Sequence, residues 1–297
     1  MKDISTAPNL ICYDPKKYSE YQSLESGYIL KIDGGIIPNV LLETHQAVWS
    51  PTPFAINLGE VIASDNCQNK VVMDFATGSG YLAIIAGKQG ARKVVATDLN
   101  PTAIQMTKRN WELNNLNAKQ LDAIVSDRFE AMKNNANIEE KFDFIYSNPP
   151  TIPELEKKTS KNSGMDWNID GESGRNALDT LITEGRNFLK SGGEILIATS
   201  SKQGAKLTCE LLDEYWGIGI KADSEDPLDY SLDWEKRGNA NWVVIKRQAV
   251  PFPYYVEFLD KFRELAKETN QPDPFIEKEG TLYQKLYLIR AKKVDSF

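Results

Sequence analysis

The chain has 297 residues, of which 41% are hydrophobic, which is enough for a sizeable core but leaves the number of domains open. Its 35 basic and 42 acidic residues give a net charge of -7, which argues against a protein that binds nucleic acid mainly through phosphate contacts. Three widely spaced cysteines support neither a disulfide framework nor a CxxC metal site, and a single histidine excludes a multi-histidine metal site.

Residues 1–66 differ from the rest of the chain and are expected to form an N-terminal extension. The segment 28–42 predicts two short strands around the turn Asp33-Gly34-Gly35, and 45–64 predicts a proline-rich loop that leads into an apolar helix. The first residues, MKDISTAPNL, contain no apolar signal segment, and no apolar run approaches the length of a membrane span. We therefore expect a cytoplasmic protein with no membrane partner.

Residues 67–297 are expected to form one α/β domain, because short apolar runs alternate with segments of helix length. This alternation predicts a doubly wound, Rossmann-like sheet that is mostly parallel, with an antiparallel strand at its edge. Expected strands are 70–75, 93–98, 121–126, 142–147, 194–200, 242–247 and 285–294. Expected helices include 101–115, 176–190, 202–216 and 254–268, and Gly192 and Gly193 are expected to stop the second of these. A polar loop at 154–175 and C-terminal additions at 217–284 complete the domain.

A glycine-rich loop follows the first strand of this domain, in the sequence VVMDFATGSGYLA at 71–83. Gly78 and Gly80 stand at the head of a helix, in the G-x-G-x-x-A spacing typical of nucleotide-type cofactor sites. Asp98 ends the next strand, where a carboxylate can accept hydrogen bonds from ribose hydroxyls. Asp74 lies directly before the loop, where it would repel a phosphate and suit a cation.

At this point residues 70–200 resemble the class I methyltransferases, which implies S-adenosylmethionine as cofactor and S-adenosylhomocysteine as product. In that family, an acid matched by Asp74 lies near the methionine end, and one matched by Asp98 holds the ribose hydroxyls. Asp127, with Arg128 beside it, matches the place where an acid approaches the adenine amino group, although a solvated helix cap is an equal alternative. The expected cofactor-binding residues are Asp74, Ala76, Thr77, Gly78, Ser79, Gly80, Asp98, Leu99, Asn100, Asp127, Arg128 and Asn148. Asn100 is also expected to cap the following helix, with Pro101 in its first position.

The segment FDFIYSNPPTIP, 142–153, places Asn148, Pro149, Pro150 and Thr151 directly after a buried strand. A planar nitrogen is a poor nucleophile, because its lone pair is delocalised. The Asn148 side chain and the Pro149 carbonyl can accept hydrogen bonds from its N–H groups, which would orient it for in-line transfer and stabilise the developing charge. This chemistry needs neither a metal nor a histidine base. The four residues are therefore the expected catalytic motif.

The motif resembles the Asn-Pro-Pro signature of amino- and amide-directed N-methyltransferases, including release-factor glutamine and ribosomal-RNA guanine methyltransferases. An aromatic usually follows the two prolines in that group, but this chain has Thr151. Trp49, Trp167 and His45 are weak candidates for contacts with the acceptor, and ordinary packing is the simpler interpretation of each.

The sequence leaves the methyl acceptor open. A protein side-chain amide fits the motif and the acidic chain, although residues 1–66 do not resemble the helical recognition domain of release-factor methyltransferases. A small amino- or guanidino-bearing metabolite is an alternative, with 154–175 as a lid, and an RNA base is disfavoured by charge and by Thr151. A nicotinamide-dependent oxidoreductase would share the glycine loop, but it leaves the Asn-Pro-Pro motif unexplained.

Overall fold

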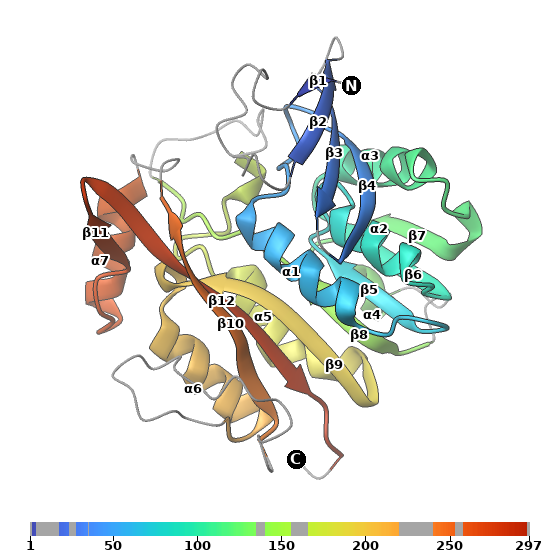
Figure 1. Cartoon of the computed structure of the whole chain (residues 1–297). Helices are drawn as coiled ribbons and strands as arrows, with labels where there is room; N and C mark the ends of the chain where they lie inside the picture. The colour runs from blue at the N-terminus through green and yellow to red at the C-terminus, as the bar shows by residue number, and fades with distance from the viewer. Residues whose placement is uncertain are drawn as a thin grey trace. The chain divides into compact units, whose positions relative to one another are not determined.

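The computed structural model describes residues 2–3, 18–23, 28–34, 36–134, 140–155, 166–219, 240–252 and 258–295 (Figure 1). The chain divides into two compact units. The first comprises Met1–Asn148 and Ser160–Trp167, and the second Pro149–Thr159 and Asn168–Phe297. The domain boundary expected at residue 66 stays a prediction. The expected loop at 154–175 and the expected additions at 217–284 lie partly outside the described residues, at 156–165, 220–239 and 253–257.

A small antiparallel sheet begins the first unit, with its strands in the order β1-β2-β3-β4. These strands are β1 (Lys2–Asp3), β2 (Tyr18–Ser23), β3 (Tyr28–Gly34) and β4 (Ile37–Glu43). The two strands expected within 28–42 are confirmed as β3 and β4, while Gly35 of the expected turn lies outside the described residues. Helix α1 (Pro53–Ser64) follows and has proline in its first turn, where the missing N–H costs nothing.

The parallel sheet of the first unit has the strand order β8-β5-β6-β7. Its strands are β5 (Val71–Phe75), β6 (Lys93–Asp98), β7 (Leu121–Val125) and β8 (Phe142–Ser147). The helices are α2 (Tyr81–Lys88), α3 (Pro101–Leu113) and α4 (Glu130–Asn134), with a 3₁₀ turn at Ala118–Gln120. Every residue of β5 is buried, as a strand covered on both faces requires. The strands and helix expected here are confirmed, with boundary shifts of a few residues.

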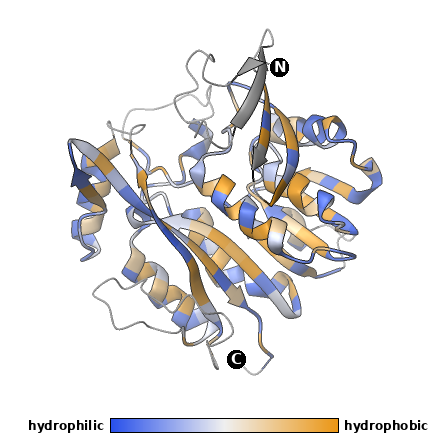
Figure 2. Cartoon of the chain, viewed as in Figure 1, coloured by the Kyte–Doolittle hydropathy of each residue, from blue (hydrophilic) through white to orange (hydrophobic). Residues whose placement is uncertain are grey.

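The second unit contains the antiparallel strands β9 (Leu189–Ser200), β10 (Trp242–Pro251), β11 (Phe275–Lys278) and β12 (Thr281–Lys292). Strand β12 pairs antiparallel with each of the other three, so the expected antiparallel arrangement of the late strands is confirmed. Figure 2 shows the apolar run of β9 coloured as hydrophobic. The helices are α5 (Asn176–Glu184), α6 (Ala205–Trp216) and α7 (Leu259–Glu268), with 3₁₀ turns at Asp166–Asn168, Gly185–Phe188 and Ser201–Gln203.

One expected boundary is wrong. The helix expected at 176–190 ends at Glu184, and the glycines expected to stop it lie inside β9. Gly192 donates its backbone N–H to the Lys293 carbonyl, and Lys293 donates to the Gly193 carbonyl. This pairing with a segment a hundred residues away overrides the local preference of glycine for a helix end. No helix in the described ranges is long and apolar enough to cross a membrane.

Candidate active site

The carboxyl ends of β5, β6, β7 and β8 meet at one edge of the parallel sheet. Ser147, the last residue of β8, donates a hydrogen bond from Oγ to the Phe75 carbonyl at 2.8 Å. Ser126, just past β7, donates its backbone N–H to the Asp98 carbonyl at 2.9 Å. Ligands of open α/β sheets bind at this edge. The expected residues Asp74, Asp98 and Asn148 and the segment 126–128 are therefore brought together.

Asp74 is fully buried at the end of β5. Its Oδ2 accepts hydrogen bonds from Thr77 Oγ1 at 2.6 Å and from the Ala83 N–H at 3.0 Å. No described residue bonds its Oδ1. Burial raises the pKa of the Asp74 carboxyl from 3.8 to about 7, against the lowering effect of these two hydrogen bonds, and the charge of Asp98 raises it further. An unpartnered buried carboxylate oxygen suits a cation, as the sequence predicts.

The glycine loop is held in left-handed conformations at Ala76 (φ 57°), Gly78 (φ 56°) and Gly80 (φ 84°). A Cβ at Gly80 would lie 3.0 Å from the Thr107 Cα, so α3 packs too closely for a larger residue there. The Thr77 N–H donates to the Thr97 carbonyl at 2.9 Å, which ties the loop to β6. These contacts explain why a small-residue loop is needed at this position.

Asp98 lies where the ribose of the cofactor is expected, and its side chain also holds the glycine loop in place. Its Oδ2 accepts from the Gly78 N–H at 2.8 Å, and its Oδ1 accepts from the Asn100 N–H at 2.9 Å. Burial raises the pKa of the Asp98 carboxyl, while the backbone hydrogen bonds lower it. The side chain is half-buried, and a carboxylate has about four lone-pair sites, so it retains capacity to accept from a ligand. The sequence did not indicate this structural contribution.

Two apolar side chains at the same edge are unusually exposed. Leu99 and Val125 are each 48% exposed, and Val125 is the register partner of Asp98 across β6 and β7. An exposed apolar pair beside a polar strand end is suited to pack against a flat ring. Leu99 is one of the cofactor-binding residues expected from the sequence. Val125 is not among them, because its sequence context is that of an ordinary strand residue.

Asp127 and Arg128 precede α4. Asp127 is exposed and forms an ion pair with Arg128, with Nη1 and Oδ1 3.0 Å apart. Arg128 adopts a φ of 48°. Ser126 Oγ accepts the Ala131 N–H at 3.0 Å, so the side-chain hydrogen bond to the start of this helix comes from Ser126. The adenine contact of Asp127 stays a prediction.

The segment 45–49 lies against the glycine loop. Asn100 Nδ2 donates to the Ala47 carbonyl at 2.7 Å, while Asn100 Oδ1 caps α3 by accepting from the Thr102 N–H, as the sequence predicts. A Cβ on Gly78 would lie 3.4 Å from the Trp49 carbonyl oxygen, so the Trp49 backbone borders the loop. His45 Nδ1 accepts the Ala47 N–H at 3.1 Å within a local turn. Both sequence candidates thus lie near the expected cofactor site.

Asn148 follows β8 in the first unit. Its side chain is half-buried, and no described residue forms a hydrogen bond with it. Pro149 is buried and Pro150 half-buried. A half-buried amide without a partner costs free energy unless water or a ligand satisfies it. The residue therefore has the exposure and the free hydrogen-bonding capacity that the expected function needs.

Thr151 belongs to the second unit and is fixed by three contacts there. Its N–H donates to Asn168 Oδ1 at 3.2 Å, and its Oγ1 accepts from Lys202 Nζ at 3.3 Å. A Cβ on Gly174 would lie 2.6 Å from the Thr151 carbonyl oxygen, so that glycine packs directly on the turn. Trp167 lies in the 3₁₀ turn Asp166–Asn168 and is half-buried, and its contact with an acceptor stays a prediction.

Lys202 is a residue that sequence analysis missed. The residue is 7% exposed, and Nζ lies 5.1 Å from the ring centroid of Phe262 and 5.7 Å from that of Phe252. Burial lowers the pKa of the Lys202 amine from 10.5 to about 7. In the sequence SSKQ it resembles a surface lysine, so only the folded chain reveals its place beside Thr151.

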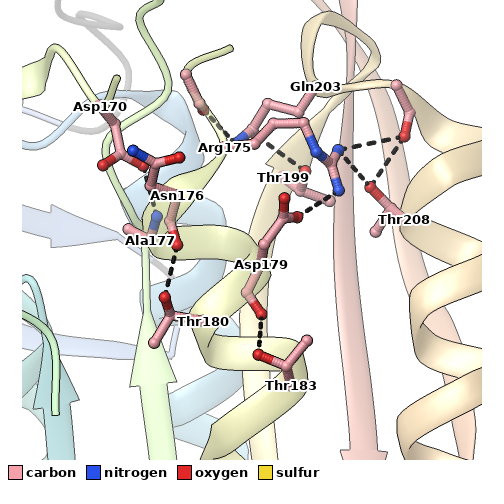
Figure 3. A network of polar contacts seen from close by, with 12 residues as sticks. Asp170, Arg175, Asn176, Ala177, Asp179, Thr180, Thr183, Thr199, Gln203 and Thr208 are labelled. Carbon is pink, nitrogen blue, oxygen red and sulfur yellow. Dashed lines mark hydrogen bonds and ion pairs between the residues drawn. The ribbon is translucent and has the colours of Figure 1, made fainter. Parts of the chain in front are cut away.

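A polar network supports the loop at 170–175, whose Gly174 packs on Thr151 (Figure 3). Arg175 is buried and donates from Nη2 to Asp179 Oδ1 at 2.6 Å and from Nη1 to Thr208 Oγ1 at 3.0 Å. Gln203 Nε2 donates to the Gly174 carbonyl at 3.3 Å. Asp170 Oδ2 accepts from the Ala177 N–H at the start of α5. Both ends of the loop are thus bonded to helices of the second unit.

Among the described residues, no group of three or more His, Cys, Asp or Glu could hold a metal ion.

Comparison with known proteins gives a family for this arrangement. The model of the ribosomal protein L11 methyltransferase family (PrmA) matches residues 56–151. A putative protein N5-glutamine methyltransferase of Methanocaldococcus jannaschii is 35% identical over 196 residues, which are 66% of this chain and 89% of that protein. The ribosomal RNA large subunit methyltransferase K/L of Colwellia psychrerythraea is 30% identical over 188 residues, which are 63% of this chain and 24% of that protein.

The fold has a counterpart among solved structures. A putative SAM-dependent methyltransferase from Streptococcus mutans has a TM-score of 0.53 at 15% identity, over 91% of this chain and 57% of that one. At this identity the likeness shows the fold alone, which is the Rossmann-like fold that the sequence predicts. The chain belongs to the family of the putative protein N5-glutamine methyltransferase that it matches, and it is an S-adenosylmethionine-dependent methyltransferase.

Proposed function

We propose that this enzyme methylates a planar nitrogen, and that its acceptor is the side-chain amide of a glutamine in a protein. The observation that carries the proposal is the half-buried Asn148 side chain, which has no described partner and follows the strand next to Asp74. The glutamine is supported by the Methanocaldococcus jannaschii relative, of which the chain covers 89%.

The expected cofactor residues fit S-adenosylmethionine, which supplies an electrophilic methyl group on its sulfonium. The unpartnered Asp74 Oδ1 would accept from the ammonium of its methionine end. The half-buried Asp98 would accept from the ribose hydroxyls, with the exposed side chains of Leu99 and Val125 against the adenine and Asp127 toward its amino group. The remaining proposed cofactor residues are Ala76, Thr77, Gly78, Ser79, Gly80, Asn100 and Arg128.

Asn148 and Pro149 would orient the acceptor. Asn148 Oδ1 and the Pro149 carbonyl would accept its two N–H groups, which holds the nitrogen in line and favours the positive charge that develops on it. Pro150 fixes the direction of the turn, because its ring locks φ. Thr151 takes the place of the usual aromatic, and Trp49, His45 and Trp167 are the candidates for further contacts with the acceptor.

An RNA base is the second candidate, favoured by the identity with the ribosomal RNA methyltransferase of Colwellia psychrerythraea. The net charge of -7 counts against it. A small amino- or guanidino-bearing metabolite is the third. A cytoplasmic location is part of the proposal.

The decisive experiment is a methyl-transfer assay with radiolabelled S-adenosylmethionine against separated protein, RNA and metabolite fractions of a cell extract. Label in the protein fraction that maps to glutamine by peptide mass spectrometry is the expected result. Label confined to RNA or to small molecules would reject the glutamine and leave the corresponding alternative.

A further inference from the structure

Two asparagines, Asn110 in α3 and Asn114 at its C-cap, hold the outer edge of β4. Asn110 Oδ1 accepts from the Glu43 N–H at 2.6 Å, and its Nδ2 donates to the Glu43 carbonyl at 3.1 Å. One turn later, Asn114 accepts from the Leu41 N–H at 3.0 Å and donates to the Leu41 carbonyl at 2.6 Å. Each side-chain amide thus replaces a neighbouring strand and satisfies backbone groups that an edge strand leaves unpaired.

The two side chains differ in one contact. Asn110 Nδ2 also donates to the Ser79 carbonyl, in the glycine loop, at 2.8 Å. Asn114 Nδ2 instead donates to the Asn110 carbonyl of its own helix, also at 2.8 Å. Asn110 is completely buried, and Asn114 is 8% exposed. One amide group therefore joins β4, α3 and the glycine loop, while its neighbour joins only β4 and α3.

The carbonyls of the loop determine where its N–H groups point. Thr107 Oγ1 donates to the Gly78 carbonyl at 3.3 Å, so α3 holds the carbonyls of both Gly78 and Ser79. In a trans peptide the N–H points opposite to the carbonyl of the same unit. The Ser79 N–H, which shares a peptide unit with the Gly78 carbonyl, is therefore directed away from α3. The Gly80 N–H shares a unit with the Ser79 carbonyl that Asn110 holds, and it donates to the Thr77 carbonyl at 2.9 Å, which closes the turn of the loop.

We propose that Asn110 is a positioning residue for the cofactor: by holding Glu43 and Ser79 together, it makes the conformation of the glycine loop depend on the docking of the N-terminal sheet. Cofactor binding and the docking of β4 are then linked, and each strengthens the other. This inference rests on the proposed contact between the glycine loop and the cofactor.

The test compares Asn110→Ala with Asn114→Ala in the full chain, because each variant unpairs one N–H and one carbonyl of β4. Isothermal titration with S-adenosylhomocysteine measures cofactor affinity, and thermal unfolding measures stability. We expect both variants to lose similar stability, but only Asn110→Ala to raise the dissociation constant, by about fivefold or more, with Asn114→Ala within about twofold of the wild type. Equal losses of affinity in the two variants, or unchanged affinity in Asn110→Ala, would overturn the inference.

A second measurement needs no variant. In hydrogen exchange of the wild-type chain, S-adenosylhomocysteine should slow exchange of the Glu43 amide more than that of the Leu41 amide. Equal slowing of the two would overturn the link through Asn110. A wild-type chain that binds no S-adenosylhomocysteine would overturn the proposed cofactor site and this inference with it, whereas binding with equal effects overturns the inference alone.

Discussion

Lys202 donates a hydrogen bond from Nζ to Thr151 Oγ1 at 3.3 Å, one residue beyond the Asn-Pro-Pro motif. In its protonated form Lys202 has three donors and no acceptor, so it cannot take the hydroxyl hydrogen of Thr151. In that form the hydrogen is available to another group. The pair supplies a polar contact at the position where the resemblance to Asn-Pro-Pro N-methyltransferases leads us to expect an aromatic.

The buried Lys202 should give the enzyme a stability that rises with pH. Its pKa is about 7 in the folded chain, against 10.5 for an ordinary lysine, so the unfolded state binds one more proton than the folded state between these two pH values. The free energy of unfolding should then rise above pH 7, by at most about 1.4 kcal/mol per pH unit. Urea unfolding at pH 7, 8 and 9 should show that Lys202→Met lacks this rise.

Lys206→Met is the matched control, because Lys206 is exposed on α6. Its pH dependence should follow the wild type. Parallel curves for the wild type and Lys202→Met between pH 7 and 9 would show that the Lys202 amine keeps an ordinary pKa.

The sequence points to those parts of the candidate site that lie within a few residues of one another. Asp74 and the glycines form one continuous motif, and the Asn100 cap depends only on its own helix. Lys202 could not be predicted, because its burial depends on Thr151, Phe252 and Phe262, all distant in the chain. The same reason applies to Asn110, whose partners lie in two separate segments.

In the fold, too, the features that the sequence did not predict depend on contacts between distant segments. Alternating apolar runs predicted the strands of the parallel sheet, since that pattern is local. The glycines at 192–193 were expected to end a helix, but their pairing with Lys293 places them in β9. Pairing between distant segments is therefore what the sequence pattern misses, in the sheet as in the site.

Cofactor affinity should depend on the protonation of Asp74. Its folded pKa of about 7 means that the carboxyl is largely neutral at pH 6 and ionised at pH 8. Since only the ionised form attracts an ammonium, the affinity for S-adenosylhomocysteine should rise across this range, by up to about tenfold per pH unit. Titration calorimetry at pH 6, 7 and 8 measures this, and Asp74→Asn should remove the rise.

A rise that persists in full in Asp74→Asn would show that a group other than Asp74 controls the affinity. A wild-type affinity that is constant from pH 6 to 8 would show that Asp74 does not face the cofactor's charge.

Asn148→Ala should separate cofactor binding from methyl transfer. The side chain has no described partner to lose, so the affinity for S-adenosylhomocysteine should stay within about twofold of the wild type. Loss of a preorganised acceptor for the reacting N–H should lower turnover by about a hundredfold or more. Single-turnover transfer of labelled methyl to the protein fraction measures the second quantity. Turnover within about threefold of the wild type would remove Asn148 from the orientation of the acceptor.

Gly174 should be required for the position of Thr151, and Gly280 provides the matched control. Both glycines are left-handed, with φ of 68° and 72°, so alanine meets the same backbone strain of about 1–2 kcal/mol at either site. The two sites differ in the room they leave for a side chain. A Cβ at Gly280 would have no atom within 4 Å, whereas a Cβ at Gly174 would lie 2.6 Å from the Thr151 carbonyl oxygen and 2.9 Å from the Ile152 carbonyl carbon.

Gly174→Ala must therefore displace the turn that follows the Asn-Pro-Pro motif. It should cost about 1–3 kcal/mol more than Gly280→Ala in urea unfolding, and it should lower methyl transfer at saturating cofactor while Gly280→Ala leaves it unchanged. Equal activity of the two variants would show that the packing of Gly174 on Thr151 does not reach the reacting groups.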